Sequence, residues 1–318
     1  MSVEIEKIFP ADIRPLFAEV LKKGEMLEEI RIRLEKPLMI SGYGKEYFIR
    51  EDGSLTLYPE EGYRVRKGDL HRLMEHFTRY SPYAFEAELR EGFLSLPGGH
   101  RIGVTGEVVC TEEGRVKTLK NISSINIRIA RYVQGVAEGL LPFVYENGHP
   151  CSLLLVSPPG CGKTTMLRDF IRLYSEGNTF GQGRNVGVAD ERMEIAGSYM
   201  GQAGMPLGAR TDVLSGCSKT EGVLMLIRSM NPGVIAVDEI GREEEIRLLR
   251  YAATCGITLL NTIHGQDMQD LQNKESFLGE GWLSIYDRII FLKKDGGRFG
   301  VRSLWKKDEE GEWLCVRY

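Results

Sequence analysis

The chain has 318 residues, of which 42% are hydrophobic and 27% are charged, so its composition is that of a folded globular protein rather than a disordered or fibrous one. At about 100 to 200 residues per domain, this length indicates two domains, or one large domain with an appendage. The 41 Lys and Arg against 45 Asp and Glu leave a net charge of −4, which excludes a molecule-wide positive field for DNA or RNA. Nucleic acid could be held only by a local basic patch.

No targeting or membrane-spanning segment is recognisable in the sequence. The N-terminal stretch MSVEIEKIFPADIRPLF lacks the apolar run of a signal peptide, and no stretch approaches the ~20 apolar residues of a membrane span. We therefore expect a cytoplasmic protein that reaches a membrane only through partners. The 6 cysteines are scattered without a CxxC pair, so we expect neither a zinc module nor a disulfide framework, and interpret them as reduced, mostly buried thiols.

Residues 1–145 are predicted to form a small α+β domain with an antiparallel sheet. Short alternating runs between Gly-rich turns are typical of strands with one buried face. Such runs are EIRIRLE (29–35), FLSLPGGHRIGVTGEVV (93–109) and SINIRIAR (124–131).

Two helices are expected to interrupt these strands. Leu70, Leu73 and Phe77 lie at helical spacing, and Asp69 is the expected N-cap of that helix. A second helix is expected to begin at Pro82.

Residues 146–318 are predicted to form a doubly wound α/β domain, with ENGHP (146–150) as the candidate linker. Apolar runs without alternation, each followed by helix-like sequence, indicate parallel strands buried on both faces. The C-terminal residues are expected to form hairpin strands that close one edge of the sheet. The runs are SLLLV (152–156), NVGVAD (185–190), GVIAVD (233–238), ITLLNTI (257–263) and RIIFL (288–292).

The strongest functional signal is SPPGCGKTT (157–165), between a predicted strand and a predicted helix. This order aims consecutive backbone N–H groups and a helix N-terminus at one point, which suits a triphosphate. We expect Lys163 to reach the β- and γ-phosphates and the Thr164 hydroxyl to bind Mg²⁺. Ser157 departs from the pattern, because GxxxxGK[ST] begins with Gly. The expected nucleotide-binding residues are Ser157, Pro158, Pro159, Gly160, Cys161, Gly162, Lys163, Thr164 and Thr165.

Acidic residues and a histidine follow other predicted strands, at the edge where open α/β sheets bind ligands. Asp238 is expected to hold the water shell of the metal, and Glu239 to orient and polarise the attacking water. Glu191 is the next candidate for that role, although it and Asp190 could equally cap a helix or lie exposed. His264 could sense the γ-phosphate, or be a structural loop residue.

The order of these motifs resembles the secretion-ATPase family, which includes the motors of type II and type IV secretion and of pilus assembly. VADERMEIA resembles its Asp box, IRSMNPGVIAVDEIGR its Walker B region and TIHG its His box. GGHRIGVTGE and SSINIRIAR resemble the stage III sporulation members of the family. The departures are Ser157, Asp238 where many relatives have Gly, and the lack of a CxxC zinc module.

The resemblance implies an ATP- and Mg²⁺-dependent hydrolase with a RecA-like P-loop core and a smaller, mobile N-terminal domain for regulation or oligomerisation. It implies a homo-hexamer in the mother-cell cytoplasm, docked under a secretion-like channel in the membrane between mother cell and forespore. It also implies that an N-domain arginine contacts the nucleotide. Arg128 is the first candidate, since Ile125, Ile127 and Ile129 occupy the other face of its strand, although the strand pattern alone also fits an ordinary solvated charge. Further candidates are Arg31, Arg33, Arg101 and Arg131.

The residues alone lead to a Mg²⁺-dependent NTP hydrolase, and two alternatives stay open. A nucleic-acid-translocating motor can use the same core, but the acidic balance and the lack of a basic, aromatic-interleaved stretch count against DNA or RNA. An inactive nucleotide-binding scaffold is the second, with Ser157 as its sign. Adenine is favoured over guanine because no NKxD-like sequence follows the core.

Overall fold

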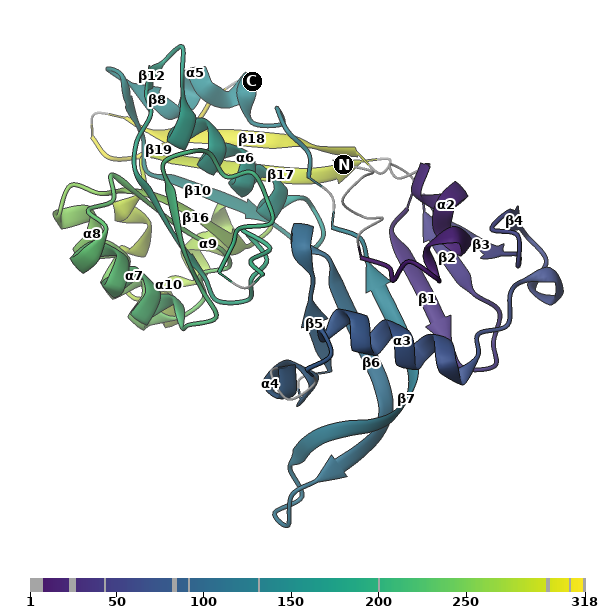
Figure 1. Ribbon diagram of the computed structural model, residues 1–318. Coiled ribbons are helices and arrows are strands. Elements are labelled where there is room, and N and C mark those ends of the chain that lie inside the picture. The colour runs from purple at the N-terminus through teal and green to yellow at the C-terminus, as the bar shows by residue number, and fades with distance from the viewer. Residues whose placement is uncertain are drawn as a thin grey trace. The chain divides into compact units, whose positions relative to one another are not determined.

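The computed structural model describes residues 8–22, 27–42, 44–81, 85–90, 92–130, 132–199, 201–295, 298–308 and 310–316. The chain divides into two compact units (Figure 1). The first unit contains Met1–Arg131 and Gly197–Gly204, and the second contains Tyr132–Ala196 and Met205–Tyr318. Residues 132–145, which we assigned to the N-terminal domain from sequence, therefore group with the second unit.

The first unit is built on a seven-stranded sheet in the order β4-β3-β2-β1-β7-β6-β5, and its paired neighbours are antiparallel. Alternation produces this sheet as expected: Ile125, Ile127 and Ile129 are buried, while Arg128 between them is exposed. The strands are β1 (Glu29–Arg33), β2 (Met39–Gly42), β3 (Lys45–Ile49), β4 (Leu55–Thr56), β5 (Phe93–Ser95), β6 (Arg101–Cys110) and β7 (Val116–Arg128).

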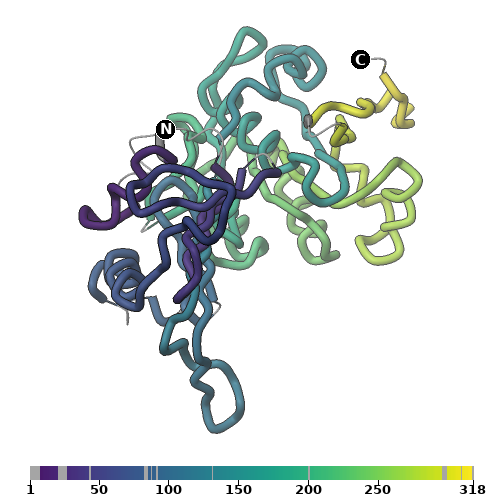
Figure 2. The backbone as a smooth tube through the Cα atoms, turned by 90° about the vertical axis from the view of Figure 1, so that its right-hand side faces the viewer, coloured from purple at the N-terminus to yellow at the C-terminus, as the bar shows by residue number. Residues whose placement is uncertain are grey.

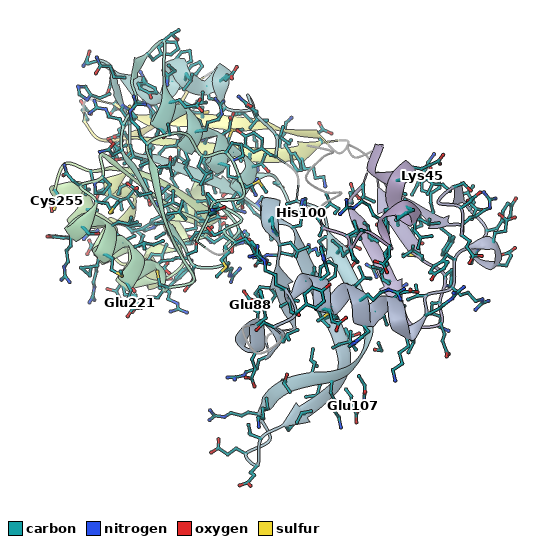
Figure 3. All side chains as sticks on the ribbon, viewed as in Figure 1. Lys45, Glu88, His100, Glu107, Glu221 and Cys255 are labelled. Carbon is teal, nitrogen blue, oxygen red and sulfur yellow. The ribbon has the colours of Figure 1, made fainter. Side chains whose placement is uncertain are left out.

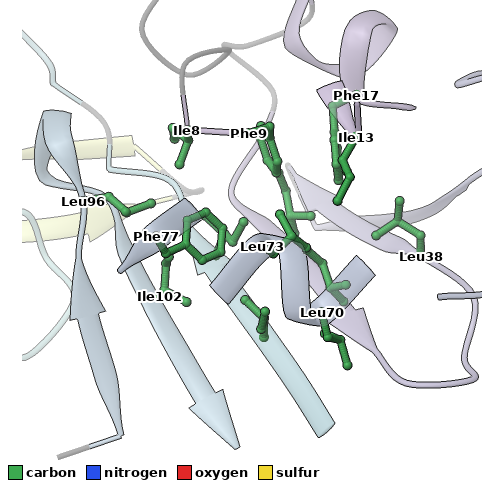
Figure 4. Close-up of a cluster of buried hydrophobic side chains, with 14 of the residues drawn as sticks. Ile8, Phe9, Ile13, Phe17, Leu38, Leu70, Leu73, Phe77, Leu96 and Ile102 are labelled. Carbon is green, nitrogen blue, oxygen red and sulfur yellow. The ribbon is translucent and has the colours of Figure 1, made fainter. Parts of the chain in front are cut away.

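Helices cover the apolar face of this sheet. Leu70, Leu73 and Phe77 of one helix point into a core that also holds Phe9 and Ile102 (Figure 4). The helices are α2 (Arg14–Lys22), α3 (Lys67–Phe77) and α4 (Glu86–Arg90).

The expected N-cap of α3 was wrong. Arg66 occupies the N-cap position, and Asp69 is the third helical residue, where its carboxylate accepts the Arg66 backbone N–H at 2.8 Å. Asp69 thus satisfies a free N–H at the start of the helix from inside the first turn. The helix expected at Pro82 falls on a residue outside the described part, and the described helix α4 begins at Glu86.

The strands β6 and β7 continue past their neighbours as a two-stranded hairpin (Figures 1 and 2). Glu107 lies on this extension (Figure 3) and its carboxylate is 3.3 Å from the Lys120 ammonium. Val108 is 48% and Val116 39% exposed, so the extension lies largely in solvent.

Gly197–Gly204 belongs to the first unit although the chain on either side belongs to the second. The guanidinium carbon of Arg79 lies 5.1 Å from the centroid of the Tyr199 ring, which holds this segment by a cation–π contact. A Cβ added to Gly204 would lie 2.7 Å from the Gly99 nitrogen, so this close approach requires glycine.

The second unit is built on an eight-stranded sheet in the order β14-β13-β15-β16-β10-β17-β18-β19. The first six are parallel, and the last two add an antiparallel edge, as predicted for the C-terminal residues. The strands are β10 (Leu153–Ser157), β13 (Val186–Asp190), β14 (Thr211–Ser215), β15 (Val234–Val237), β16 (Thr258–His264), β17 (Arg288–Asp295), β18 (Arg298–Lys307) and β19 (Trp313–Val316).

Both faces of the parallel strands are covered, as the unbroken apolar runs predicted. Every residue of β10, β13 and β15 is buried. One face packs with α7 and α8, and α6 packs on the opposite face. The helices are α5 (Leu141–Val144), α6 (Lys163–Glu176), α7 (Lys219–Ser229), α8 (Glu243–Thr254), α9 (Met268–Asn273) and α10 (Glu275–Leu278).

Smaller features of the second unit differ from the expectations. The candidate linker 146–150 takes part in a hairpin between β8 (Tyr145–Glu146) and β9 (His149–Pro150). A further two-stranded ladder joins β11 (Gly177–Asn178) to β12 (Gly181–Gln182). The cysteines are free, but "mostly buried" was wrong: Cys151 is buried, Cys161 and Cys217 are intermediate, and Cys110, Cys255 and Cys315 are exposed. Among the described residues, no helix is long and apolar enough to cross a membrane.

Candidate nucleotide site

The P-loop connects β10 to α6 as the sequence predicted. Strand β10 ends at Ser157 and α6 begins at Lys163. Gly160 and Gly162 have φ angles of 69° and 85°, in the left-handed region that glycine adopts freely. The loop therefore turns at both glycines immediately before the helix N-terminus, where anions are favoured.

Ser157 occupies the position at which the P-loop pattern has its first glycine. It is the last residue of β10 and pairs with His264 of β16, so its backbone is extended and open to any residue. Its hydroxyl donates to the Pro158 carbonyl at 2.8 Å. This departure is thus compatible with the loop conformation.

Lys163 is the first residue of α6, and its side chain is buried against the loop, with 5% of its surface exposed. Its ammonium donates to the carbonyls of Ser157 at 3.0 Å and Pro158 at 3.2 Å, and lies 2.9 Å from Nδ1 of His264. Burial lowers the pKa of Lys163, opposed by the charges of Asp238 and Glu239. Phosphate oxygens would replace these neutral acceptors with stronger, charge-assisted ones.

The two residues expected to serve a metal ion are in contact. The Thr164 hydroxyl donates to the Asp238 carboxylate at 2.7 Å, and the Thr262 hydroxyl donates to the other oxygen of that carboxylate. Among the described residues, no group of three or more His, Cys, Asp or Glu could hold a metal. One hydroxyl and one carboxylate suit Mg²⁺, which keeps several waters and takes further oxygens from a substrate phosphate.

Glu239 lies at the centre of the acidic side of the site. Its carboxylate lies 3.0 Å from Nε2 of His264 and accepts a hydrogen bond from the Arg192 guanidinium at 3.1 Å. His264 contacts Lys163 through its other ring nitrogen, so it bridges the P-loop lysine and Glu239. The structure thus brings Lys163, Glu239 and His264 together, although they lie far apart in sequence.

Two groups hold the backbone of Glu239, which has a left-handed φ of 52°. Its N–H donates to the Thr262 hydroxyl at 2.8 Å, and its carbonyl accepts from Lys219 at 2.5 Å. A non-glycine residue in this conformation costs free energy, which the surrounding contacts must offset. Thr262 also donates to Asp238, so one side chain orients both acidic residues.

Lys219, Thr262 and Arg192 were missed by the sequence analysis. Lys219 begins α7, is 14% exposed in its side chain, and lies 3.7 Å from the Glu191 carboxylate and 3.6 Å from that of Glu245. A lysine at a helix start and a threonine within a strand carry no sequence pattern of their own. Arg192 directly follows Asp190 and Glu191, two of the predicted candidates, so its position in VADERME was a usable signal.

The acids that follow β13 have different surroundings. Asp190 is 2% exposed and accepts backbone N–H groups of Glu194, Ile195 and Ala196, so it organises the turn after the strand. Burial raises the pKa of Asp190, and these three hydrogen bonds oppose the rise.

Glu191 is more exposed than Asp190 and pairs with Lys219, the residue that holds the carbonyl of Glu239. This pairing places Glu191 behind the backbone of Glu239, whereas the Glu239 carboxylate itself meets His264 beside the P-loop lysine. The geometry therefore makes Glu191 a weaker base candidate than Glu239.

The candidate arginines of the first unit lie on its sheet. Arg128 has a 67% exposed side chain that lies 3.9 Å from the Glu29 carboxylate, a weak surface pair. Arg31 pairs with Glu29 at 2.8 Å, and the Arg101 guanidinium lies 5.5 Å from the Phe93 ring centroid. Arg33 ends β1. Arg131 lies outside the described residues. Of Arg31, Arg101 and Arg128, Arg128 thus has the weakest of these contacts within its own unit.

Comparison with known proteins places the chain among sporulation proteins with a secretion-ATPase fold. Residues 2–314 match the profile of the family described as Sporulation stage III, protein AA. The chain is 36% identical to the stage III sporulation protein AA of Bacillus subtilis (strain 168) over 306 residues, covering 96% of this chain and 95% of that protein.

Solved structures show the same fold at low sequence identity. The ATPase DotB of Legionella pneumophila matches with a TM-score of 0.61 at 18% identity, over 93% of this chain and 82% of that one. The pilus retraction motor PilT, solved with bound ADP, matches with a TM-score of 0.59 at 15% identity, over 94% and 83%. The RecA-like P-loop core and the secretion-ATPase resemblance predicted from the motifs are therefore confirmed.

Proposed function

The chain belongs to the stage III sporulation protein AA family, and from that premise we propose that it is a Mg²⁺-dependent ATP hydrolase. One observation carries the proposal: within the second unit, Lys163, Thr164–Asp238 and Glu239–His264 converge at the N-terminus of α6. Phosphate-binding, metal-binding and water-polarising groups then lie at one place, which a bare Gly-rich turn would not require.

We assign the steps of hydrolysis to these side chains. Lys163 and the backbone N–H groups of 160–165 hold the phosphates, and Thr164 and Asp238 would hold Mg²⁺. When bound, Mg²⁺ would neutralise the charge on the β- and γ-phosphate oxygens. Glu239 orients the water that attacks the γ-phosphorus and accepts its proton. The bond between the γ-phosphorus and the β–γ bridging oxygen breaks, and ADP and phosphate leave.

His264 and Arg192 would report the nucleotide state to this base. Each contacts Glu239, and His264 also contacts Lys163. A γ-phosphate that binds the Lys163 ammonium would break its contact with Nδ1 of His264. Loss of that contact would let the His264 ring turn and so change its contact with the Glu239 carboxylate.

The remaining elements of the proposal rest on the family. We propose that the first unit regulates turnover and supports a homo-hexameric ring, and that its Arg128 reaches a bound nucleotide as a phosphate-stabilising arginine. The protein would work in the mother-cell cytoplasm under a secretion-like channel, and power or assemble that channel between mother cell and forespore.

Phosphate release from ATP tests the proposal against its alternatives. We expect hydrolysis that needs Mg²⁺, stops with EDTA and is unchanged by single- or double-stranded DNA or by RNA. Strong stimulation by nucleic acid would identify a translocase instead. Binding of Mg²⁺-ATP without turnover, in both the monomeric and the assembled protein, would identify a scaffold.

A further inference from the structure

The hairpin of β17 and β18 brings an aromatic ring to the P-loop. Strand β17 pairs in parallel with β10, the strand that leads into the loop, and β18 follows on its far side (Figure 1). Phe299 is the second residue of β18, and its ring lies against Gly162 of the P-loop. A Cβ on Gly162 would lie 3.0 Å from Cγ of Phe299 and 3.2 Å from its Cδ1, so the ring covers the face that only glycine leaves open.

The ring is held there but not buried. Phe299 is 55% exposed, although it is among the most apolar side chains. Lys294, directly opposite in the ladder, places its ammonium 5.5 Å from the ring centroid. On the same strand, Arg302 donates to the Gln266 carbonyl at 2.9 Å, two residues after His264. The hairpin thus contacts both the P-loop, at Gly162, and the segment that follows His264.

We propose that Phe299 is the stacking surface for the base of the bound nucleotide, with Lys294 beside it; this inference rests on the proposed nucleotide site. Lys163 would hold the phosphate end of the substrate, so the nucleoside extends from the P-loop onto a surface beside it. The exposed ring lies against the residue that precedes Lys163 and is the kind of surface on which bases stack.

The chemistry of this surface defines what it recognises. A ring face binds any base, because every base has a π-face, and stacking favours the larger purines. Phe299 and Lys294 offer no acceptor side chain that would select one exocyclic group. The surface therefore distinguishes a nucleoside triphosphate from a bare polyphosphate and a purine from a pyrimidine, rather than adenine from guanine.

The test compares the affinities of ATP and inorganic tripolyphosphate, both with Mg²⁺, in the full chain. Phe299→Ala should weaken ATP binding by roughly 5- to 150-fold, the range found when a base-stacking ring is replaced by alanine, and leave tripolyphosphate binding unchanged. Phe299→Trp should restore ATP affinity. Its added fluorescence, relative to wild type, should be quenched by ATP and not by tripolyphosphate.

The chain supplies a matched control. Phe277 is 54% exposed and has Lys274 at 5.9 Å from its ring centroid, so Phe277→Ala removes another exposed ring with a lysine beside it. It should change neither affinity. Equal ATP affinity in Phe299→Ala, or an equal loss for ATP and tripolyphosphate, would overturn the stacking role while the phosphate site stands. A wild-type protein that binds neither ligand would overturn the proposed function as well.

Discussion

The two units use their sheets differently. In the first unit, one sheet face is packed and the other carries charged side chains, such as Arg31 and Arg128. In the second unit, the central parallel strands are buried on both faces, and polar groups are concentrated where the strands end. In the second unit, a polar residue at a strand end therefore indicates a candidate site residue, because the buried strands leave few other positions for polar side chains. In the first unit the same residue type is spread along an exposed face.

This difference predicts unequal effects of mutation. Removing a charge at a strand end of the second unit should change nucleotide chemistry strongly. Removing one from the sheet of the first unit should matter only if that residue reaches the nucleotide.

Lys163→Ala should have the largest effect. The ammonium would meet the β- and γ-phosphates, and each charged hydrogen bond lost costs roughly 10- to 100-fold in affinity. Equilibrium binding of Mg²⁺-ATP should therefore fall below detection at micromolar protein. The control is Lys274→Ala, which removes another largely buried, ion-paired lysine of the same unit. Wild-type ATP affinity in Lys163→Ala would contradict the assignment of Lys163 to the β- and γ-phosphates.

Lys219→Met should lower kcat, with little change in KM. Lys219 holds the carbonyl of Glu239, and a catalytic group displaced by about 1 Å can lose up to ~100-fold in rate. Lys219→Arg should recover part of the rate, since it keeps a cation between Glu191 and Glu245. An equal loss of kcat in Lys274→Met would point to stability rather than to positioning.

Arg128→Ala tests whether the first unit contributes to the site. Its surface pair with Glu29 is weak, so folding and assembly should be unchanged. Turnover should fall by at least about tenfold, because an arginine that stabilises the transferred phosphate contributes far more than a surface charge. Arg115→Ala, with an 83% exposed side chain in the same unit, is the control. Normal turnover in Arg128→Ala would leave this arginine as an ordinary surface charge.

The pH dependence of ATP binding should show the smallest effect. Burial lowers the pKa of Lys163 in the free protein, and bound phosphates would raise it again. Affinity should therefore fall as the pH rises through the lowered pKa, and binding should take up a proton in that range. Calorimetry in buffers of different ionisation enthalpy measures this uptake. It should disappear in Lys163→Arg, whose guanidinium stays charged.

The sequence could predict those features that leave a local pattern. Apolar runs identified the central parallel strands, and the P-loop pattern located Lys163 between a strand and a helix. Ser157 looked like a defect in that pattern, but its extended backbone in β10 requires no glycine. Strand β14 escaped prediction because it is only half-buried and begins in a polar sequence.

Features that depend on tertiary contacts left no such pattern. Lys219 reaches Glu239 only because α7 begins beside the end of β15, and Phe299 meets Gly162 only because β17 pairs with β10. Gly197–Gly204 joins the first unit from within the second for the same reason. The residues that we assign to the phosphates and the metal ion therefore carry a sequence pattern, whereas Lys219 and Phe299 do not.

The most direct test of the account compares binding and turnover of Mg²⁺-ATP in Glu239→Gln and in the wild-type protein. The amide keeps the size of the side chain but cannot accept the proton of the attacking water, and the contact between Thr164 and Asp238 is untouched. We predict near-normal affinity with turnover reduced by about 10²- to 10⁴-fold. Glu244→Gln, on a 63% exposed side chain of α8, is the control and should hydrolyse normally. Wild-type turnover in Glu239→Gln would contradict the central claim that this glutamate drives hydrolysis.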